Sequence, residues 1–195
     1  MMTEDKVSLE LTEEILKSME IGVVFRDYNC RINSMDFHKA SNYLVTASDD
    51  ESIRLYDVST ATCLKTINSK KYGVDLVSFT SHPTTVIYSS RNGWDESLRL
   101  LSLNDNKYLR YFKGHHDRVV SLSFSTRNEC FISASLDRTV MLWDQRADKC
   151  QVTNSPKRPS QFMIISLCRV FCMSKQGLRR LMMIKGLSLR LHLGV

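Results

Sequence analysis

The segment GHHDRVVSLSFSTRNECFISASLDRTVMLWD, Gly114 to Asp144, contains histidine, serine, aspartate and tryptophan side chains. These residue types could form a hydrolytic triad, or they could form a buried hydrogen-bond network that holds a fold together. Apolar and polar residues alternate in the short runs SLSF, CFISAS and TVMLW, which are separated by polar turns at TRNE and LDR. The segment therefore predicts three short β-strands joined by tight turns.

The same pattern occurs twice more along the chain. RINSMDFHKASNYLVTASDDESIRLYD (31–57) aligns without gaps with residues 118–144 at an offset of 87, and a middle copy occupies 74–103 with three additional residues in one turn. Half of this offset lies within the ~40–45 residue period of WD-type propeller blades. A fourth strand-like run follows the first two copies, at 62–67 and 107–112. The sequence thus predicts an all-β WD40 β-propeller, here an incomplete one of about three four-stranded blades.

The repeats divide the chain into five parts. The N-terminal segment, 1–26, is expected to contain a short helix capped by Thr12 and a strand at 20–26 that would complete the last blade. The other expected parts are WD repeat 1 at 27–68, WD repeat 2 at 69–112, WD repeat 3 at 113–151 and a non-homologous basic tail at 152–195. Because three blades cannot close a ring, we expect open sheet edges and exposed blade faces.

We assign a structural hydrogen-bond ladder to four residues of the third repeat: His115, Ser133, Asp137 and Trp143. Asp137 is expected to accept from the imidazole and from nearby backbone N–H groups, while Ser133 bridges the imidazole and the indole N–H; Ser135 is the alternative hydroxyl. A catalytic serine would need an exposed position and an oxyanion pocket, which a mid-strand serine beside a tryptophan does not have. We therefore predict no catalytic residue.

The other two repeats retain only parts of this ladder. Repeat 1 has Thr46, Asp50 and Tyr56 but lacks the Gly-His pair, and repeat 2 has only Asp95, with Leu101 in place of tryptophan. We expect the third blade to be the most rigid.

Composition excludes several other classes of protein. The 195 residues are 43% hydrophobic, enough for a folded core, and no apolar run approaches the roughly 20 residues of a membrane helix. The charged N-terminus is unlike a secretory signal, so the six cysteines are expected to be reduced thiols. No second pair of ligands follows Cys168 and Cys172 at zinc-site spacing. We expect neither a metal nor a cofactor.

The tail differs in charge from the rest of the chain. It has eight Lys and Arg and no acidic residue, whereas residues 1–151 have 19 basic and 21 acidic residues. A basic amphipathic tail could neutralise nucleic-acid phosphates, although it contains only two aromatic residues and no recognition module. Alternatively, the codons for residues 151–153 permit a splice donor and those for residues 167–169 permit a splice acceptor. The number of nucleotides between these two sites is not a multiple of three. The tail could then be a retained intron followed by translation out of frame, and Met182-Met183-Ile184 would encode Asp-Asp in the shifted frame with any choice of codons.

Two stretches are more specific than the generic repeat: SKKYGVDLV (69–77) and SLNDNKYLRYFKGH (102–115). Together with LTEEILKSMEIGVVFR (11–26) and INSMDF (32–37), they resemble the WD repeat-containing protein 82 family over about 11–151. That family forms seven-bladed propellers and supplies the small propeller subunit of the COMPASS (Set-type) histone H3 lysine 4 methyltransferase.

The resemblance implies a nuclear, non-enzymatic scaffold whose partners are protein subunits of that complex. It also implies indirect association with chromatin, contact with the phosphorylated RNA polymerase II tail and a role in transcription termination. No membrane partner and no small-molecule substrate are expected. A nucleic-acid-binding protein acting through the tail and a non-functional truncated isoform are the alternatives.

Four basic residues are candidate contacts to a partner or to phosphate groups: Lys70, Lys71, Arg110 and Lys113. Their charged N–H groups can donate to phosphate oxygens. Solvated side chains at strand ends are the alternative interpretation. An enzyme is not expected, because the sequence contains no phosphate-binding glycine loop, metal cluster or usable triad.

Overall fold

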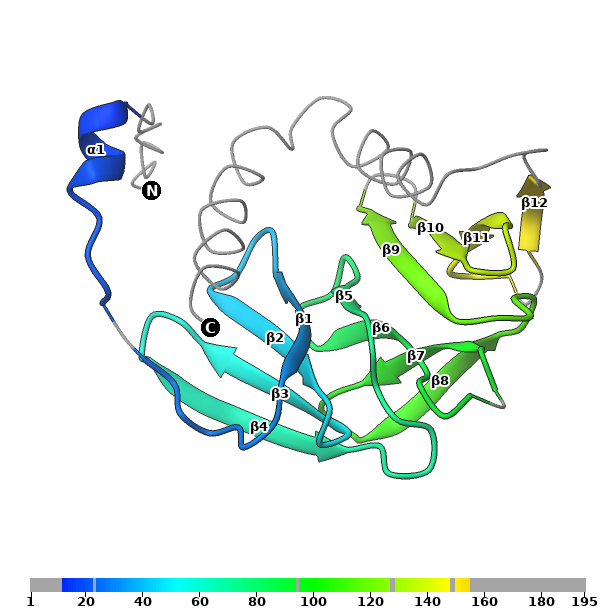
Figure 1. The fold of residues 1–195 in the computed structure, drawn as a ribbon, viewed down its shortest axis with the longest axis horizontal. Coiled ribbons are helices and arrows are strands. Elements are labelled where there is room, and N and C mark those ends of the chain that lie inside the picture. The colour runs from blue at the N-terminus through cyan, green and yellow to red at the C-terminus, as the bar shows by residue number, and fades with distance from the viewer. Residues whose placement is uncertain (1–11, 23, 94, 127–128, 148–149, 155–195) are drawn as a thin grey trace, which may run out of the picture.

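The computed structural model describes residues 12–154, except 23, 94, 127, 128, 148 and 149 (Figure 1). The described residues form one helix followed by strands only. In chain order the elements are α1 (Glu13–Lys17), β1 (Ile32–Phe37), β2 (Tyr43–Ser48), β3 (Ser52–Asp57), β4 (Thr62–Asn68), β5 (Val77–Phe79), β6 (Thr85–Ser89), β7 (Leu98–Ser102), β8 (Lys107–Phe112), β9 (Val119–Ser125), β10 (Cys130–Ser135), β11 (Val140–Asp144) and β12 (Cys150–Asn154).

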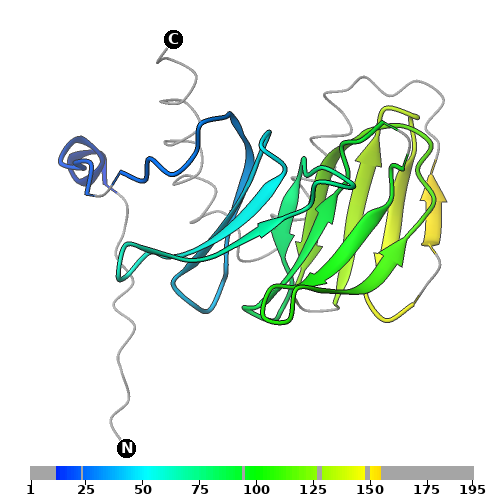
Figure 2. The same cartoon turned by 90° about the horizontal axis from the view of Figure 1, so that it is seen from below.

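These strands form three four-stranded antiparallel sheets, β1–β4, β5–β8 and β9–β12, and in each sheet neighbouring strands follow one another in the sequence. We call the sheets blades one, two and three. They lie side by side along an arc, with β1–β4 at one end and β9–β12 at the other (Figures 1 and 2). A four-stranded meander in each repeat is the architecture of a propeller blade. The expected all-β, incomplete propeller is therefore confirmed.

The turns between the second and third strands of blades one and three have the same conformation. Glu51 and Arg138, which are 87 residues apart, have φ of 65° and 69°. The aspartate just before each of them, Asp50 or Asp137, accepts a hydrogen bond from the backbone N–H two residues further on, at 3.0 Å and 2.8 Å. A short polar side chain that bonds to its own turn stabilises such a turn, so the repeat fixes the position of each aspartate.

Two apolar layers hold the three blades together. The first lies between blades one and two and includes Val45, Ile53 and Leu55 on one side and Phe79, Val86 and Leu101 on the other. The second lies between blades two and three and includes Leu98, Leu100 and Phe112 opposite Phe124, Phe131 and Trp143. Strand alternation sends successive side chains to opposite faces of each sheet. Blade two is therefore covered on both faces, whereas each outer blade contributes one face to a layer.

Polar contacts near the innermost strands also join the blades. Asp36 on β1 accepts hydrogen bonds from the backbone N–H of Phe79 at 2.8 Å and from the Ser78 hydroxyl at 2.9 Å. Between blades three and two, Arg118 Nε donates to Asp75 Oδ2 at 2.7 Å, and Asp75 is 4% exposed. Charge-assisted hydrogen bonds of this kind fix the relative position of neighbouring sheets.

The N-terminal segment contains the helix but no strand among its described residues. α1 begins after Thr12, whose Oγ1 accepts from the backbone N–H of Ile15 at 3.4 Å, and Glu13 and Glu14 occupy its first turn. The strand expected at 20–26 is absent from the described residues of that range. A strand requires a hydrogen-bonded neighbour, and the described residues include no blade in front of blade one. No helix in the described part of the chain is long and apolar enough to cross a membrane.

Blade three extends further than the sequence predicted. β12 ends at Asn154 and pairs with β11 through Met141↔Thr153 and Leu142↔Val152. β12 thus runs three residues past the expected repeat boundary at 151, because the edge of β11 offers backbone partners to the residues that follow. The rest of the tail, 155–195, including Cys168 and Cys172, lies outside the described residues.

Candidate functional site

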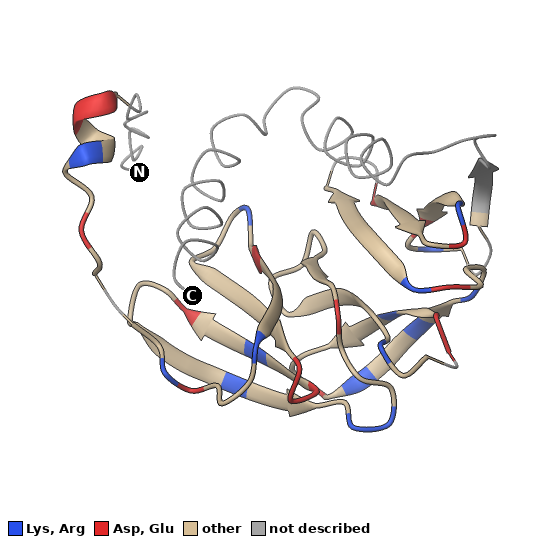
Figure 3. Ribbon diagram, viewed as in Figure 1, with Lys and Arg blue, Asp and Glu red and all other residues tan. Residues whose placement is uncertain are grey.

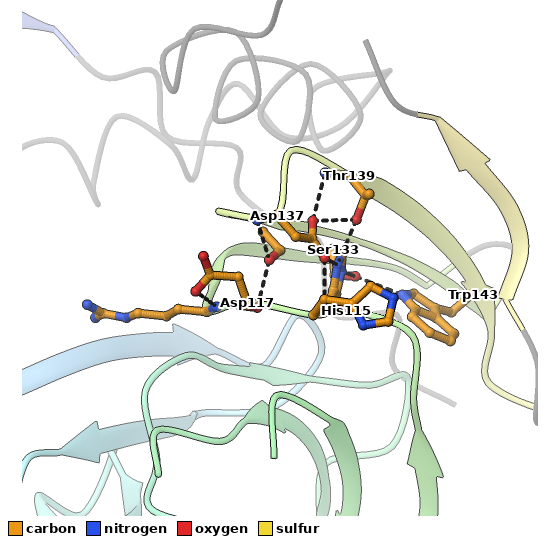
Figure 4. Close-up of polar contacts among 9 residues, drawn as sticks. His115, Asp117, Ser133, Asp137, Thr139 and Trp143 are labelled. Carbon is orange, nitrogen blue, oxygen red and sulfur yellow. Dashed lines mark hydrogen bonds and ion pairs between the residues drawn. The ribbon is translucent and has the colours of Figure 1, made fainter. Parts of the chain in front are cut away.

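The four predicted ladder residues come together at one end of blade three (Figure 4). His115 precedes β9, Ser133 lies on β10, Asp137 lies in the β10–β11 turn and Trp143 lies on β11. Ser133 Oγ is 2.6 Å from His115 Nε2 and 2.7 Å from Trp143 Nε1, and His115 Nδ1 is 3.2 Å from Asp137 Oδ2. The antiparallel pairing of β9, β10 and β11 supplies this proximity.

The chemistry of the donors determines the direction of each hydrogen bond. An indole N–H can only donate, so Trp143 donates to Ser133, whose single hydroxyl proton is then available for His115 Nε2. A neutral imidazole that accepts at Nε2 must carry its proton on Nδ1, which faces the Asp137 carboxylate. One tautomer of His115 therefore satisfies all four groups.

Thr139 is a fifth member that the sequence analysis did not identify. Its hydroxyl donates to Asp137 Oδ1 at 2.6 Å and lies 3.0 Å from His115 Nδ1, so it can share the imidazole proton with Asp137. A hydroxyl two residues after the turn aspartate is the signal that could have revealed it, since Ser52 has the same relationship to Asp50. The alternative hydroxyl, Ser135, does not join the ladder: it donates to the backbone carbonyl of Asp117 at 2.7 Å.

Burial determines which charges this network holds. Desolvation lowers the pKa of His115 below its ordinary value, and the negative charge of Asp137 only partly opposes this effect. Burial raises the pKa of Asp137, but hydrogen bonds from Thr139 and from the His116 backbone outweigh it, so the net pKa is lowered. The ladder thus contains a neutral imidazole beside an ionised carboxylate.

The site is closed to a substrate-sized molecule. Ser133 and Trp143 are both 0% exposed. A Cβ on Gly114 would lie 2.9 Å from Met141 Sδ and 3.0 Å from the edge of the Trp143 ring, so the backbone itself seals the side next to His115. A nucleophile must reach the carbonyl that it attacks, and the Ser133 hydroxyl has no such access.

Blade one has a related network built around a tyrosine. Tyr28 lies 87 residues before His115, and its hydroxyl is 2.7 Å from Thr46 Oγ1. The guanidinium carbon of Arg54 lies 3.9 Å from the centre of the Tyr28 ring, and Arg54 pairs with Asp50 at 3.5 Å. Sequence analysis missed Tyr28, although extending the repeat alignment backwards from 31 places it on His115.

Blade two has a buried arginine instead of the histidine ladder. Arg99 is 0% exposed, donates through Nη2 to Asp95 Oδ2 at 2.5 Å and also bonds to the Ser90 hydroxyl. The ring of Tyr72 covers its guanidinium at 3.6 Å. Leu101, at the position of the tryptophan, packs in the apolar layer toward blade one. Asp95 thus belongs to an ion pair that the sequence analysis did not predict.

Two of the four candidate contact residues, Lys70 and Lys71, are exposed neighbours in the connection between β4 and β5. The Lys71 ammonium is 5.1 Å from the centre of the Tyr72 ring, a cation–π distance. This connection therefore presents adjacent basic groups and an aromatic ring at the surface.

The other two candidates lie elsewhere. Arg110 pairs with Leu100 and lies on the side of β8 that faces blade three. Its charge acts on Asp144 of that blade: hydrogen bonds from Arg146 lower the pKa of Asp144, and the charge of Arg110 lowers it further. Lys113 is exposed just after β8. Basic and acidic residues are interspersed over the three sheets (Figure 3). The structure therefore does not bring all four residues into one patch.

The described residues contain no group of three or more His, Cys, Asp or Glu side chains that could hold a metal ion. Four of the cysteines, Cys30, Cys63, Cys130 and Cys150, are present as thiols and not as disulfides.

Two of the three repeats match a known protein family. Residues 20–57 and 106–144 match the family described as WD domain, G-beta repeat. The first range includes β1–β3 of blade one, and the second includes the ladder residues of blade three. Two stretches of the chain thus match the WD repeat. Blade two, which lies between the two matches, has the same four-stranded meander as its neighbours.

Several curated proteins are similar to this chain. "Protein ANTHESIS POMOTING FACTOR 1" of Arabidopsis thaliana is 50% identical over 73% of the chain and 44% of its own length. "WD repeat-containing protein 82" of Drosophila melanogaster is 43% identical over 74% of the chain and 45% of its own length. "Set1 complex component swd2" of Schizosaccharomyces pombe is 35% identical over 74% of the chain and 41% of its own length. The predicted resemblance to WD repeat-containing protein 82 is confirmed, and the chain spans less than half the length of these relatives.

Proposed function

We propose that the chain is a non-enzymatic scaffold subunit of a Set1-type (COMPASS-like) histone H3 lysine 4 methyltransferase complex in the nucleus. The observation that carries the proposal is its similarity to relatives named as a Set1 complex component and as WD repeat-containing protein 82. The buried ladder agrees with this role, because its polar groups bond to one another and Ser133 is inaccessible. These contacts stabilise blade three.

Co-purification tests the proposed role. The full 195-residue chain, tagged and expressed in cells that contain a Set1-type methyltransferase, is expected to recover the catalytic subunit. A matched variant, Leu64→Glu, changes an exposed residue of β4 and reveals whether this strand takes part. Recovery of soluble, folded chain without the catalytic subunit would overturn the proposal.

The finer proposal is that the complex reaches the phosphorylated tail of RNA polymerase II, and termination of transcription, partly through this chain. Lys70 and Lys71 support it, because they are adjacent exposed basic residues and the Lys71 ammonium lies beside the ring of Tyr72, which suits a phosphate next to an aromatic residue. The double variant Lys70→Glu/Lys71→Glu is expected to weaken binding to a phosphorylated tail peptide. Arg110→Glu is the control, because Arg110 lies on the other side of blade two. Equal loss in both variants, or no loss in the double variant, would refute this contact.

The charge of the tail supports a second candidate, direct binding to nucleic acid. The full chain would then bind duplex DNA or RNA with an affinity that falls steeply with salt, whereas a chain that ends at Asn154 would not. Equal affinity of the two chains would refute it. Sequencing the transcript across codons 151–170 tests the retained-intron hypothesis, which a dominant, translated message containing this segment would contradict.

A further inference from the structure

Exposed apolar side chains gather on the outermost strand of blade two. β8 is the last strand of its sheet and lies on the convex side of the arc (Figure 1). On this strand Leu109 is 55% exposed, Tyr111 42% and Tyr108 37%. Among strands β1–β11, whose side chains the structure describes, only β8 exposes more than one large apolar side chain. Such a group of exposed apolar residues marks a candidate interaction surface.

A β-bulge places Leu109 at the surface. Two consecutive residues of β7 pair with Arg110 and Tyr108, so Leu109, which lies between these two, is the extra residue of the bulge. A bulge redirects a side chain and interrupts the pairing of the strand. Leu64 is the extra residue at the same point of β4 and is 50% exposed. The two leucines form a matched pair, of which only Leu109 has aromatic neighbours on its own strand.

A chain of hydroxyl groups fixes the orientation of Tyr108. The Tyr88 hydroxyl donates to the Tyr108 oxygen at 3.1 Å. Because Tyr88 has a single hydroxyl proton, the Ser69 hydroxyl, 3.0 Å away, donates to Tyr88 in turn. Ser69 and Tyr88 are buried, whereas Tyr108 is exposed. The chain therefore ends in a Tyr108 hydroxyl proton that is available to an acceptor on a partner.

Neighbouring rings hold this surface in one arrangement. The ring centre of Tyr108 lies 5.6 Å from that of Tyr111 and 6.0 Å from that of Tyr72. Tyr72 in turn covers the buried guanidinium of Arg99 at 3.6 Å. Side chains that are already fixed lose little conformational entropy when a partner packs on them. The exposed rings are therefore prepared for binding.

The charge around β8 favours an acidic partner. Residues 62–73 contain three basic residues and no acidic residue, and residues 104–113 contain three basic residues and one acidic residue. Over residues 1–151 as a whole, acidic residues outnumber basic ones. Lys107 at the start of β8 and Lys113 just after its end are both exposed. Opposite charges on a partner would steer it to this strand.

We propose that the outer surface of β8, formed by Lys107, Tyr108, Leu109 and Tyr111, binds an acidic segment of a partner protein that also carries apolar side chains. The apolar side chains of the partner cover Leu109 and the two rings, which removes apolar surface from water. Its carboxylates accept from the Tyr108 hydroxyl and pair with the Lys107 ammonium. Positive charge alone would suit a nucleic acid, whereas its combination with an exposed leucine favours a protein segment.

Binding of short synthetic peptides to the purified full-length chain tests this proposal. The probe is a peptide of Glu and Leu; one control peptide has Lys in place of Glu, and the other has Ser in place of Leu. Fluorescence anisotropy is expected to show that the Glu–Leu peptide binds about tenfold more tightly than either control, and that its affinity falls as salt is raised. The peptides contain no phosphate, so the result is independent of the proposed contact with the phosphorylated polymerase tail.

Variants of the exposed residues locate the binding surface. Leu109→Glu should abolish detectable binding of the Glu–Leu peptide, because it replaces an apolar contact with a like charge. Leu64→Glu makes the same change at the equivalent bulge of β4 and should leave the affinity unchanged. Tyr108→Phe keeps the ring but loses the donor, and should weaken binding about tenfold. Circular dichroism reports whether each variant folds, and Leu109→Ser is the replacement if Leu109→Glu does not.

Several results would overturn the proposal. They are no binding of the Glu–Leu peptide, equal binding of the Lys–Leu peptide, equal loss in Leu64→Glu and Leu109→Glu, or unchanged affinity in Tyr108→Phe. A single-stranded oligonucleotide is the probe for nucleic acid. If it binds and Leu109→Glu abolishes that binding, while the Glu–Leu peptide does not bind, the surface recognises nucleic acid and the proposal is wrong.

Discussion

The Trp143 indole donates to the Ser133 hydroxyl at 2.7 Å, although the two residues are on different strands of blade three. The same hydroxyl lies 2.6 Å from His115 Nε2. One serine thus connects a ring on β11 with a ring that precedes β9. This relationship explains how a His, Ser and Asp set can be present without a substrate site, because every polar atom is bonded to another member of the set.

Replacing Ser133 with alanine is expected to destabilise the protein by about 2–4 kcal/mol, since it leaves a buried indole N–H and a buried imidazole nitrogen without partners. Ser133→Thr keeps the hydroxyl, as blade one does with Thr46, and is expected to be much milder. Urea unfolding followed by circular dichroism measures both variants. Equal destabilisation by alanine and threonine would show that volume, and not the hydroxyl, matters at this position.

Stability is expected to depend on pH through His115. Burial lowers its pKa in the folded state, so the unfolded chain takes up a proton at a higher pH than the folded chain does. The contribution to stability is therefore complete above the ordinary pKa of 6.5 and is lost as the pH falls below it. The slope from this residue can reach about 1.4 kcal/mol per pH unit. Unfolding measured between pH 7 and pH 5 should be less pH-dependent in His115→Asn, and an unchanged slope would contradict the assignment.

In blade two, Asp95→Asn is expected to cost about 3–5 kcal/mol, because it leaves the buried Arg99 guanidinium without its counter-charge. Arg99→Met introduces the residue that blade three has at the equivalent position, Met141. The double variant Asp95→Asn/Arg99→Met should therefore recover much of the loss. Denaturant midpoints of the three variants measure this, and a double variant that is less stable than Asp95→Asn would disprove the coupling.

The sequence predicted the blades because they follow from a gap-free repeat, whereas the His115 ladder was predicted from the types of four residues in blade three. An 87-residue offset transfers strand register and turn chemistry together, so Asp50 and Asp137 occupy the same place in their turns. The networks of blades one and two were not predicted because their partners differ in type. A tyrosine replaces the histidine in blade one, and in blades one and two an arginine, Arg54 or Arg99, occupies the position of Met141 and pairs with the turn aspartate.

The two ends of the repeats show how strongly a strand depends on its neighbours. Strands need neighbours, and a single sequence does not say which neighbours exist. Residues 20–26 have the alternating pattern of a strand but no partner strand among the described residues. Residues 152–154 extend β12 along the open edge of β11 in the register of blade one, since Met141 pairs with Thr153 as Arg54 pairs with Thr66.

A double-mutant cycle between His115 and Trp143 tests the central claim, that the buried polar side chains of blade three act as one structural unit. The two rings are joined through Ser133, so His115→Gln and Trp143→Phe together should cost less than the sum of the single variants, with a coupling energy of about 0.5–3 kcal/mol. Strict additivity, within about 0.5 kcal/mol, would show that the residues act separately and would contradict the account.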